Sequence, residues 1–158
     1  MPRRKNVQSG LHRTAAFTLI EILIAMAIMS IVAMVAVPTY SGYMERIEIA
    51  NVEADFVKID MAMQGYWVSY GSYPPDLETL NLQKDDPWGS PYQYLNMALT
   101  KGNGQKRKDH NLVPLNTDYD LYSKGPDGRS VGPLTAKHSR DDIIRANNGD
   151  YVGVASDY

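Results

Sequence analysis

The chain has 158 residues, 44 % of them hydrophobic, a formal net charge of −2 and no cysteine. This length allows one modest domain with an appendage, and the lack of cysteine excludes a fold stapled by disulfides. Four of the 16 Lys and Arg precede residue 17, and the other 12 are outnumbered by 17 Asp and Glu in residues 38–158. This acidic balance argues against a general nucleic-acid binder.

A basic segment opens the chain, and an apolar segment follows it. The charged residues of segment 1–16 are all basic: Arg3, Arg4, Lys5 and Arg13. Residues 17–37 carry one charged side chain, Glu21, and a helix of this length spans the roughly 30 Å of a bilayer core. Because basic residues tend to remain cytoplasmic, we expect a single inner-membrane span over 17–37, with the N-terminus inside and the following domain outside.

Glu21 distinguishes this segment from simpler membrane signals. A cleavable secretory signal and a plain single-span anchor would each leave a carboxylate in the apolar run unexplained. The run is also longer than the roughly 7–15 residues of a secretory apolar region. A carboxylate at the bilayer centre costs about 2.5–3.5 kcal/mol on insertion scales, and less near the interface. The sequence therefore indicates a function for Glu21.

The run Ala15-Ala16-Phe17-Thr18-Leu19-Ile20-Glu21 resembles the type IV prepilin signal. The resemblance implies that a prepilin peptidase removes a leader of residues 1–16 between Ala16 and Phe17. It also implies that the new amino group of Phe17 is methylated and that Glu21 is the glutamate of the fifth mature position. The family usually has glycine before the cut, where this chain has Ala16.

Cleavage before Phe17 would create a positively charged amine four residues from Glu21. We expect the amine of one subunit to pair with Glu21 of a neighbouring subunit and to set the axial register of a helix bundle. The alternative is a carboxylate that snorkels to the interface without a partner.

Residues 38–70 continue the helical pattern after Pro38, where we expect a kink or a locally melted turn. Two apolar stripes recur at spacings of three and four residues, on roughly opposite helix faces. The first stripe comprises Ile47, Ala50, Ala54, Val57, Met61, Gln64 and Val68, and the second comprises Ile49, Val52, Phe56, Ile59, Met63 and Tyr70. We expect one stripe to pack on the chain's own domain and the other on neighbouring helices, and we interpret the charged residues between them as mostly solvated. The alternative is a helix buried inside a larger domain.

Residues 71–158 are predicted to form a small globular α+β head. We expect strands near 92–94 and at 119–123, with Trp88 filling the junction between helix and sheet. The polar stretch 101–116, which contains Lys106-Arg107-Lys108, is interpreted as a flexible, solvated surface loop rather than a site for DNA or acidic lipid.

Three runs in the head resemble, in the family's order, the major pseudopilin of type II secretion systems: Gly71-Ser72-Tyr73-Pro74, Asp86-Pro87-Trp88-Gly89-Ser90-Pro91-Tyr92 and Asp120-Leu121-Tyr122-Ser123-Lys124-Gly125-Pro126-Asp127-Gly128. The resemblance implies a pilin-like α+β fold, in which a long N-terminal helix packs on a small antiparallel sheet with a C-terminal calcium-binding loop. It also implies a homopolymer, a short periplasmic pseudopilus, that drives the export of folded proteins across the outer membrane. Its implied partners are minor pseudopilins, an inner-membrane assembly platform and a cytoplasmic ATPase. Residues 101–116 look like an insertion, and the tail 144–158 extends beyond the compact family members.

The segment 123–142 is rich in glycine and proline. Its carboxylates are Asp127, Asp141 and Asp142. Carboxylates that converge with backbone carbonyls suit a hard cation such as Ca²⁺, whereas the chemistry alone also allows aspartates that only form turns or cap a helix. The resemblance implies a calcium site here. The implied ligands are the side chains of Asp127 and Asp142 and the carbonyls of Lys124 and of Ser139 or Arg140.

Catalysis is not expected from this sequence. Its histidines, His12, His110 and His138, lack a nucleophile motif and zinc-ligand spacing, and no phosphate-cradling motif is present. The alternatives to a pseudopilus subunit are a subunit of an extracellular type IV pilus and, more remotely, a membrane-anchored hydrolase.

Overall fold

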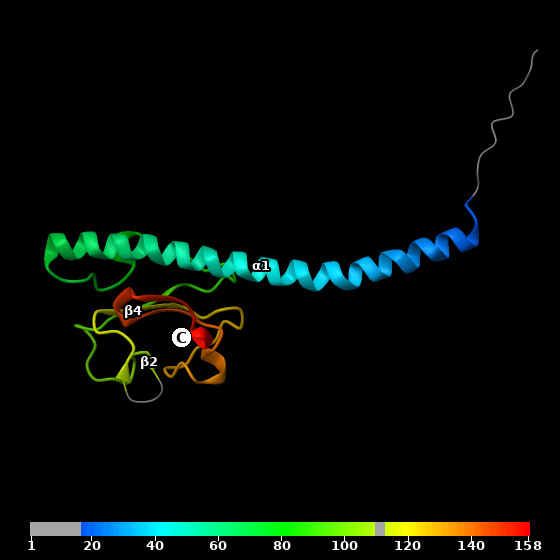
Figure 1. Cartoon of the computed structure of the whole chain (residues 1–158). Coiled ribbons are helices and arrows are strands. Elements are labelled where there is room, and N and C mark those ends of the chain that lie inside the picture. The colour runs from blue at the N-terminus through cyan, green and yellow to red at the C-terminus, as the bar shows by residue number, and fades with distance from the viewer. Residues whose placement is uncertain (1–16, 110–112) are drawn as a thin grey trace, which may run out of the picture. The chain divides into compact units, whose positions relative to one another are not determined.

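The computed structural model describes residues 17–109 and 113–158. Helix α1 (Leu19–Tyr70) comes first in the chain, and short strands and turns follow it (Figure 1). The chain divides into two compact units, Met1–Gly42 and Tyr43–Tyr158. The first unit contains the N-terminal part of α1 and the second contains the remainder of the helix and the whole sheet.

Helix α1 passes through Pro38 without a break in the helix. The predicted melted turn is therefore wrong. The hydroxyl of Thr39, the residue after the proline, donates a hydrogen bond to the carbonyl of Val35 at 2.9 Å. The helix thus covers both predicted segments, 17–37 and 38–70.

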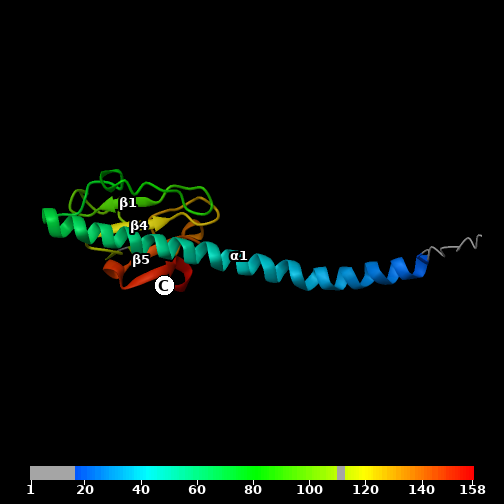
Figure 2. The same cartoon turned by 90° about the horizontal axis from the view of Figure 1, so that it is seen from above.

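The second unit contains a four-stranded antiparallel sheet with the strand order β1-β4-β5-β6. Its strands are β1 (Gln93–Asn96), β4 (Tyr119–Ser123), β5 (Ile143–Ala146) and β6 (Tyr151–Val154). The expected α+β class, with a long helix on a small antiparallel sheet, is confirmed. Figure 2 shows the C-terminal half of α1 running along this sheet.

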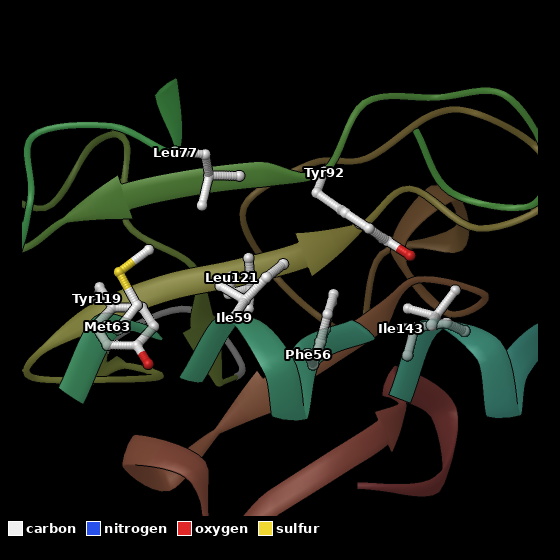
Figure 3. Close-up of a cluster of buried hydrophobic side chains, with 9 residues drawn as sticks. Phe56, Ile59, Met63, Leu77, Tyr92, Tyr119, Leu121 and Ile143 are labelled. Atoms are coloured by element: carbon white, nitrogen blue, oxygen red, sulfur yellow. The ribbon is translucent and has the colours of Figure 1, made fainter. Parts of the chain in front are cut away.

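The main hydrophobic core lies between α1 and one face of the sheet (Figure 3). From the helix, the second apolar stripe supplies the buried side chains of Val52, Phe56, Ile59 and Met63. From the sheet, alternate residues of β4 and the start of β5 meet them: Tyr119, Leu121 and Ile143. Trp88 packs against the rim of this core as predicted, and its indole nitrogen donates to Glu48 at 3.0 Å.

The opposite face of the sheet is covered by the chain's own loops. A second apolar cluster there comprises Leu115, Leu134, Ile144, Ala146 and Ala155. The stretch 101–116 contributes to this cover through a small second sheet, β2 (Lys108–Asp109) with β3 (Val113–Pro114). The prediction of a solvated loop is wrong at its centre, because Arg107 is buried.

The tail 144–158 forms part of the sheet. Asn147 and Asn148 adopt positive φ in the turn between β5 and β6, as asparagine tolerates. Strand β6 then adds the last strand of the sheet.

Candidate functional site

At the N-terminal end of α1, which begins at Leu19, Thr18 and Glu21 form a local capping arrangement, and Phe17 directly precedes it. Ala16, on the other side of the predicted cut, lies outside the described residues. The Glu21 carboxylate accepts from the backbone nitrogen of Thr18 at 3.4 Å, and the Thr18 hydroxyl accepts from the backbone nitrogen of Glu21 at 3.3 Å. These reciprocal bonds form a capping box. Glu21 therefore stabilises the start of its own helix, a role that the sequence analysis did not include.

The apolar segment of the first unit has no partner within its own unit. Every residue from 17 to 41 is exposed, and Phe17 exposes 77 % of its surface. An 18-residue window of the helix reaches a mean hydropathy of 2.6 with no buried residue. By length and composition this helix can cross a membrane.

The first apolar stripe of residues 38–70 is exposed except for the half-buried Ile47. In the second stripe the four central residues, Val52, Phe56, Ile59 and Met63, are buried, whereas Ile49 is half-buried and Tyr70 at the end of the helix is exposed. Met61 exposes 69 % of its surface, whereas Met63, two positions further on, exposes 0 %. Val57 and Val68 are exposed with Met61. The structure thus confirms that one stripe packs on the chain's own domain, and it leaves the other without a cover among the described residues of the second unit.

One of the charged helix residues interpreted as solvated, Asp55, is buried instead. Asp55 accepts from Lys84 at 2.6 Å, Lys58 at 3.1 Å and the Tyr92 hydroxyl at 3.0 Å. Burial would raise its pKa, but these hydrogen bonds outweigh burial and lower the pKa below its ordinary value. Asp55 thus joins the helix to the segment that leads into β1.

A second buried network centres on Arg145 of β5, whose side chain is 4 % exposed. Its guanidinium lies 3.0 Å from the Asp60 carboxylate and 2.7 Å from the Asp118 carboxylate. It also stacks over the Tyr119 ring, 4.1 Å from the centroid, and the Tyr119 hydroxyl donates to Asp60 at 2.5 Å. No local motif marks these residues, because the partners are up to 85 positions apart.

The loop of residues 124–142 has an outer half in which Asp127 is exposed. Asp127 accepts from the Arg129 nitrogen at 2.7 Å and lies 3.0 Å from the His138 ring. The His138 contact, followed by the Arg129 bond, lowers the pKa of Asp127. Its own backbone nitrogen donates to the Asp141 carboxylate at 3.2 Å, so these two aspartates lie on the same side of the loop.

The backbone of Gly125 lies against Asp141. Gly125 has a φ of +62°, and a Cβ there would lie 2.1 Å from the Asp141 carbonyl oxygen. The Arg140 carbonyl, a predicted metal ligand, accepts a hydrogen bond from the Ser156 nitrogen at 3.0 Å. The other predicted backbone ligand is the carbonyl of Lys124, which directly precedes Gly125 in the same tight turn.

The inner half of the loop contains Asp142, which is fully buried. Its Oδ2 accepts from the Arg107 guanidinium and from the Ser130 hydroxyl, each at 2.6 Å. Its Oδ1 has no hydrogen-bond partner among the described residues. Burial raises the pKa of Asp142, and the opposing effects of Arg107 and Ser130 do not cancel the rise.

The predicted calcium ligands therefore separate into two environments. Asp127 is exposed on the outer half, whereas Asp142 is buried against a guanidinium. Within residues 17–109 and 113–158, no three His, Cys, Asp or Glu side chains converge, so a calcium ion here would also need backbone carbonyls as ligands. Asp142 does not fit a cation, because Arg107 already neutralises it. Asp127 and Asp141 remain compatible with one.

The family model for the prokaryotic N-terminal methylation motif matches residues 11–37. This match covers the predicted processing site and the apolar segment, including Phe17 and Glu21.

Curated relatives extend the similarity over most of the chain. A type II secretion system core protein G of Pseudomonas aeruginosa is 31 % identical over 143 residues, which cover 77 % of this chain and 89 % of the relative. The protein of the same description from Klebsiella pneumoniae is 28 % identical over 137 residues, covering 84 % and 94 %. That of Pectobacterium carotovorum is 29 % identical over 143 residues, covering 77 % and 81 %. No solved structure matches the chain.

Proposed function

We propose how this chain assembles from the premise that it belongs to the family of type II secretion system core protein G. It is a structural subunit of a secretion pseudopilus. The observation that carries the assembly proposal is the exposed apolar surface of α1, which the described chain leaves uncovered. The comparisons do not favour an extracellular type IV pilus or a membrane-anchored hydrolase. We propose no catalytic role for any residue.

Maturation is the first proposed step. A prepilin peptidase would cleave between Ala16 and Phe17 and leave a methylated amine on Phe17. Because the methylation motif includes both residues, the mature protein is expected to start at Phe17. Mass spectrometry of the protein purified from membranes tests this, and a chain that starts at Met1 would contradict it.

Assembly would then depend on the charge of Glu21. In the apolar surroundings of neighbouring helices, a carboxylate without a positive partner is costly, and the new amine of an adjacent subunit supplies that partner. The capping box offers a way to separate this role from the local one. Glutamine also serves in a capping box, so Glu21→Gln keeps the local bond and removes the charge.

The matched control is Thr18→Ala, which removes the cap hydroxyl and keeps the charge. We expect Glu21→Gln to insert into the membrane and to form no filaments, as judged by electron microscopy of sheared pseudopili. Thr18→Ala should still form them. If Thr18→Ala abolishes filaments and Glu21→Gln does not, Glu21 acts only as a helix cap.

The proposed topology has the N-terminus in the cytoplasm and the head in the periplasm of a single-pass inner-membrane protein. The basic segment before the helix supports it. Because the chain has no cysteine, single cysteines report topology cleanly. In a strain without prepilin peptidase, which keeps the leader on the chain, Ser156→Cys on the exposed surface of the head should react with an impermeant maleimide in spheroplasts, and Ser9→Cys should not. The reverse labelling would overturn the topology.

In the filament, the exposed stripe of α1 would pack on the helices of other copies. The remaining proposed partners are minor pseudopilins, the inner-membrane assembly platform and the cytoplasmic ATPase. A chain that carries both Ala54→Cys and Val68→Cys, two exposed positions, should give disulfide-linked dimers and ladders in the assembled filament. Cysteines in the buried stripe should give none.

Calcium binding remains a proposal, supported by the outer half of the loop. Asp127, Asp141 and the Lys124 carbonyl would contribute oxygen ligands, the donors that Ca²⁺ prefers. Ligand binding stabilises the folded state, so calcium should raise the melting temperature of the full chain in detergent. Asp127→Asn should remove that rise. An identical melting temperature in calcium and in chelator would remove the proposal.

A further inference from the structure

Arg107 is buried although it belongs to a polar, basic stretch of sequence. Its side chain is 3 % exposed, whereas its neighbours Lys106 and Lys108 are half-buried. A buried guanidinium costs free energy unless acceptors surround it. The position of Arg107 therefore requires specific partners.

Those partners come from the loop of residues 124–142. One terminal nitrogen of the guanidinium donates to Asp142 at 2.6 Å. The other donates to the carbonyl of Val131 at 2.9 Å and to the hydroxyl of Ser130. The guanidinium also lies over the ring of Tyr122 in β4, 4.3 Å from its centroid. A single side chain thus contacts the loop at three residues and the sheet at one.

The backbone holds the same two segments together. The Lys108 nitrogen donates to the Gly132 carbonyl at 3.0 Å, and the Leu134 nitrogen donates to the Lys108 carbonyl at 3.1 Å. The Arg107 nitrogen donates to the buried Asp120 carboxylate of β4 at 2.7 Å. The backbone at Arg107 is therefore bonded to the sheet, and the backbone at Lys108 is bonded to the loop. Both contacts fix the position from which the Arg107 side chain extends.

We propose that Arg107 is a built-in cation that closes the inner half of the 124–142 loop on the sheet, in place of a bound metal ion. Asp142 is a fully buried carboxylate and needs a positive partner. The guanidinium supplies that charge, together with directed hydrogen bonds to Ser130 and Val131 that suit its planar shape. A divalent cation on the same carboxylate would meet the guanidinium charge and be repelled.

The proposal concerns the inner half of the loop and is separate from the calcium site proposed at Asp127 and Asp141. It predicts that the loop stays folded against the sheet when calcium is removed. It also predicts that the loop opens when the guanidinium is removed, with or without calcium.

Trypsin reports on the loop because the loop contains four cleavage sites. These are Lys124, Arg129, Lys137 and Arg140. The full chain in detergent is digested in calcium and in chelator, and cleavage within the loop is followed by mass spectrometry. We expect the wild type to be cut at the same rate, within twofold, in both conditions.

Arg107→Met should be cut at least tenfold faster in both conditions, because Asp142 is then buried without a partner. Lys106→Met removes the same charge at the adjacent residue and should behave as the wild type. If Arg107→Met does not accumulate, Arg107→Met with Asp142→Leu removes both charges. We expect this double variant to accumulate, because it leaves no unpaired buried charge.

Two results would overturn the proposal. One is wild-type loop cleavage that rises in chelator to the rate of the arginine variant, since a metal would then hold the loop. The other is an Arg107→Met chain whose loop is cut as slowly as that of the wild type, or a double variant that fails to accumulate, because the loop would then not depend on this charge pair. A melting temperature that falls in chelator while loop cleavage stays constant supports separate outer and inner sites.

Discussion

The two apolar regions of α1 differ in how much of their apolar side chains the chain itself buries. Residues 17–41 are exposed on every side, whereas between 49 and 63 the apolar side chains facing the sheet are buried and those on the opposite face are not. A one-sided stripe matches a single sheet in the same chain, but a helix that is apolar all round needs lipid or other subunits. The hydrophobicity of a helix alone therefore does not show whether it packs within its own chain or against lipid and other subunits. The distribution of apolar residues around the helix does.

The same contrast appears within a single turn of the helix. Met61 and Met63 are identical in chemistry and lie on opposite sides, one exposed and one buried. Matched substitutions at such pairs of positions test whether the head packs its core without other subunits and whether the exposed face of the helix is needed for assembly.

The largest effect on stability is expected for Met63→Ala. Removing this buried side chain leaves a cavity in the core between helix and sheet and should lower the free energy of unfolding by about 3 kcal/mol. Denaturant unfolding of the full chain in detergent measures the change, followed by the fluorescence of Trp88 at the rim of that core in a Trp67→Phe background that removes the other tryptophan. Met61→Ala should stay within about 0.5 kcal/mol of the wild type. Equal losses at the two positions would contradict the one-sided packing.

Gly125→Ala should cost about 2 kcal/mol or more. The new Cβ would collide with the Asp141 carbonyl, and the residue would have to keep a positive φ. Gly104→Ala is the control, since nothing lies within 4 Å of its Cβ position and its φ is ordinary. Similar unfolding free energies for the two variants would show that the turn at Gly125 relaxes easily.

Asp55→Asn should cost about 1 kcal/mol at neutral pH, because a charge-assisted contact between the helix and Lys84 is lost. The folded-state pKa of Asp55 lies below the ordinary value of 3.8. Its contribution is therefore fully present above about pH 4 and is lost as the pH falls through the lower, folded-state pKa. The difference between variant and wild type should shrink on acidification below pH 4. A difference that grows there would reverse the sign of the argument, and Glu45→Gln on the exposed helix surface should show neither effect.

The smallest effect on stability, within about 0.5 kcal/mol, is expected for Met61→Lys. Yet a charge on the exposed stripe should reduce filament formation, because it would be desolvated against a neighbouring helix. Counting pseudopili at matched expression levels measures this. Abundant filaments from this variant would mean that the stripe faces solvent in the assembly.

Much of the fold follows from local sequence signals. The helix pattern predicted a helix through residue 70, and the strand 119–123 was predicted with its observed bounds. The strands β2, β3, β5 and β6 were missed, since two to four residues carry too little periodicity to distinguish them from loops.

The charged residues were interpreted least well. Arg107 lies between two lysines and has the pattern of a solvated loop, yet its acidic partner is 35 residues away. Asp142 was predicted beside Asp127 as a metal ligand, but the structure directs their side chains to different environments. Adjacent aspartates in the sequence do not reveal which of them faces the interior.

From its residues alone this protein can be assigned a membrane-length helix, a processing motif with a carboxylate at its fifth mature position, and a helix with two apolar faces. Periodicity and composition are properties of a local segment, so they can be read from the sequence without knowledge of the tertiary structure. Only the tertiary structure decided which face is covered by the sheet and that Arg107 meets Asp142. Those outcomes depend on which distant segments the sheet brings together, because a buried charge is stable only beside a partner that the fold supplies.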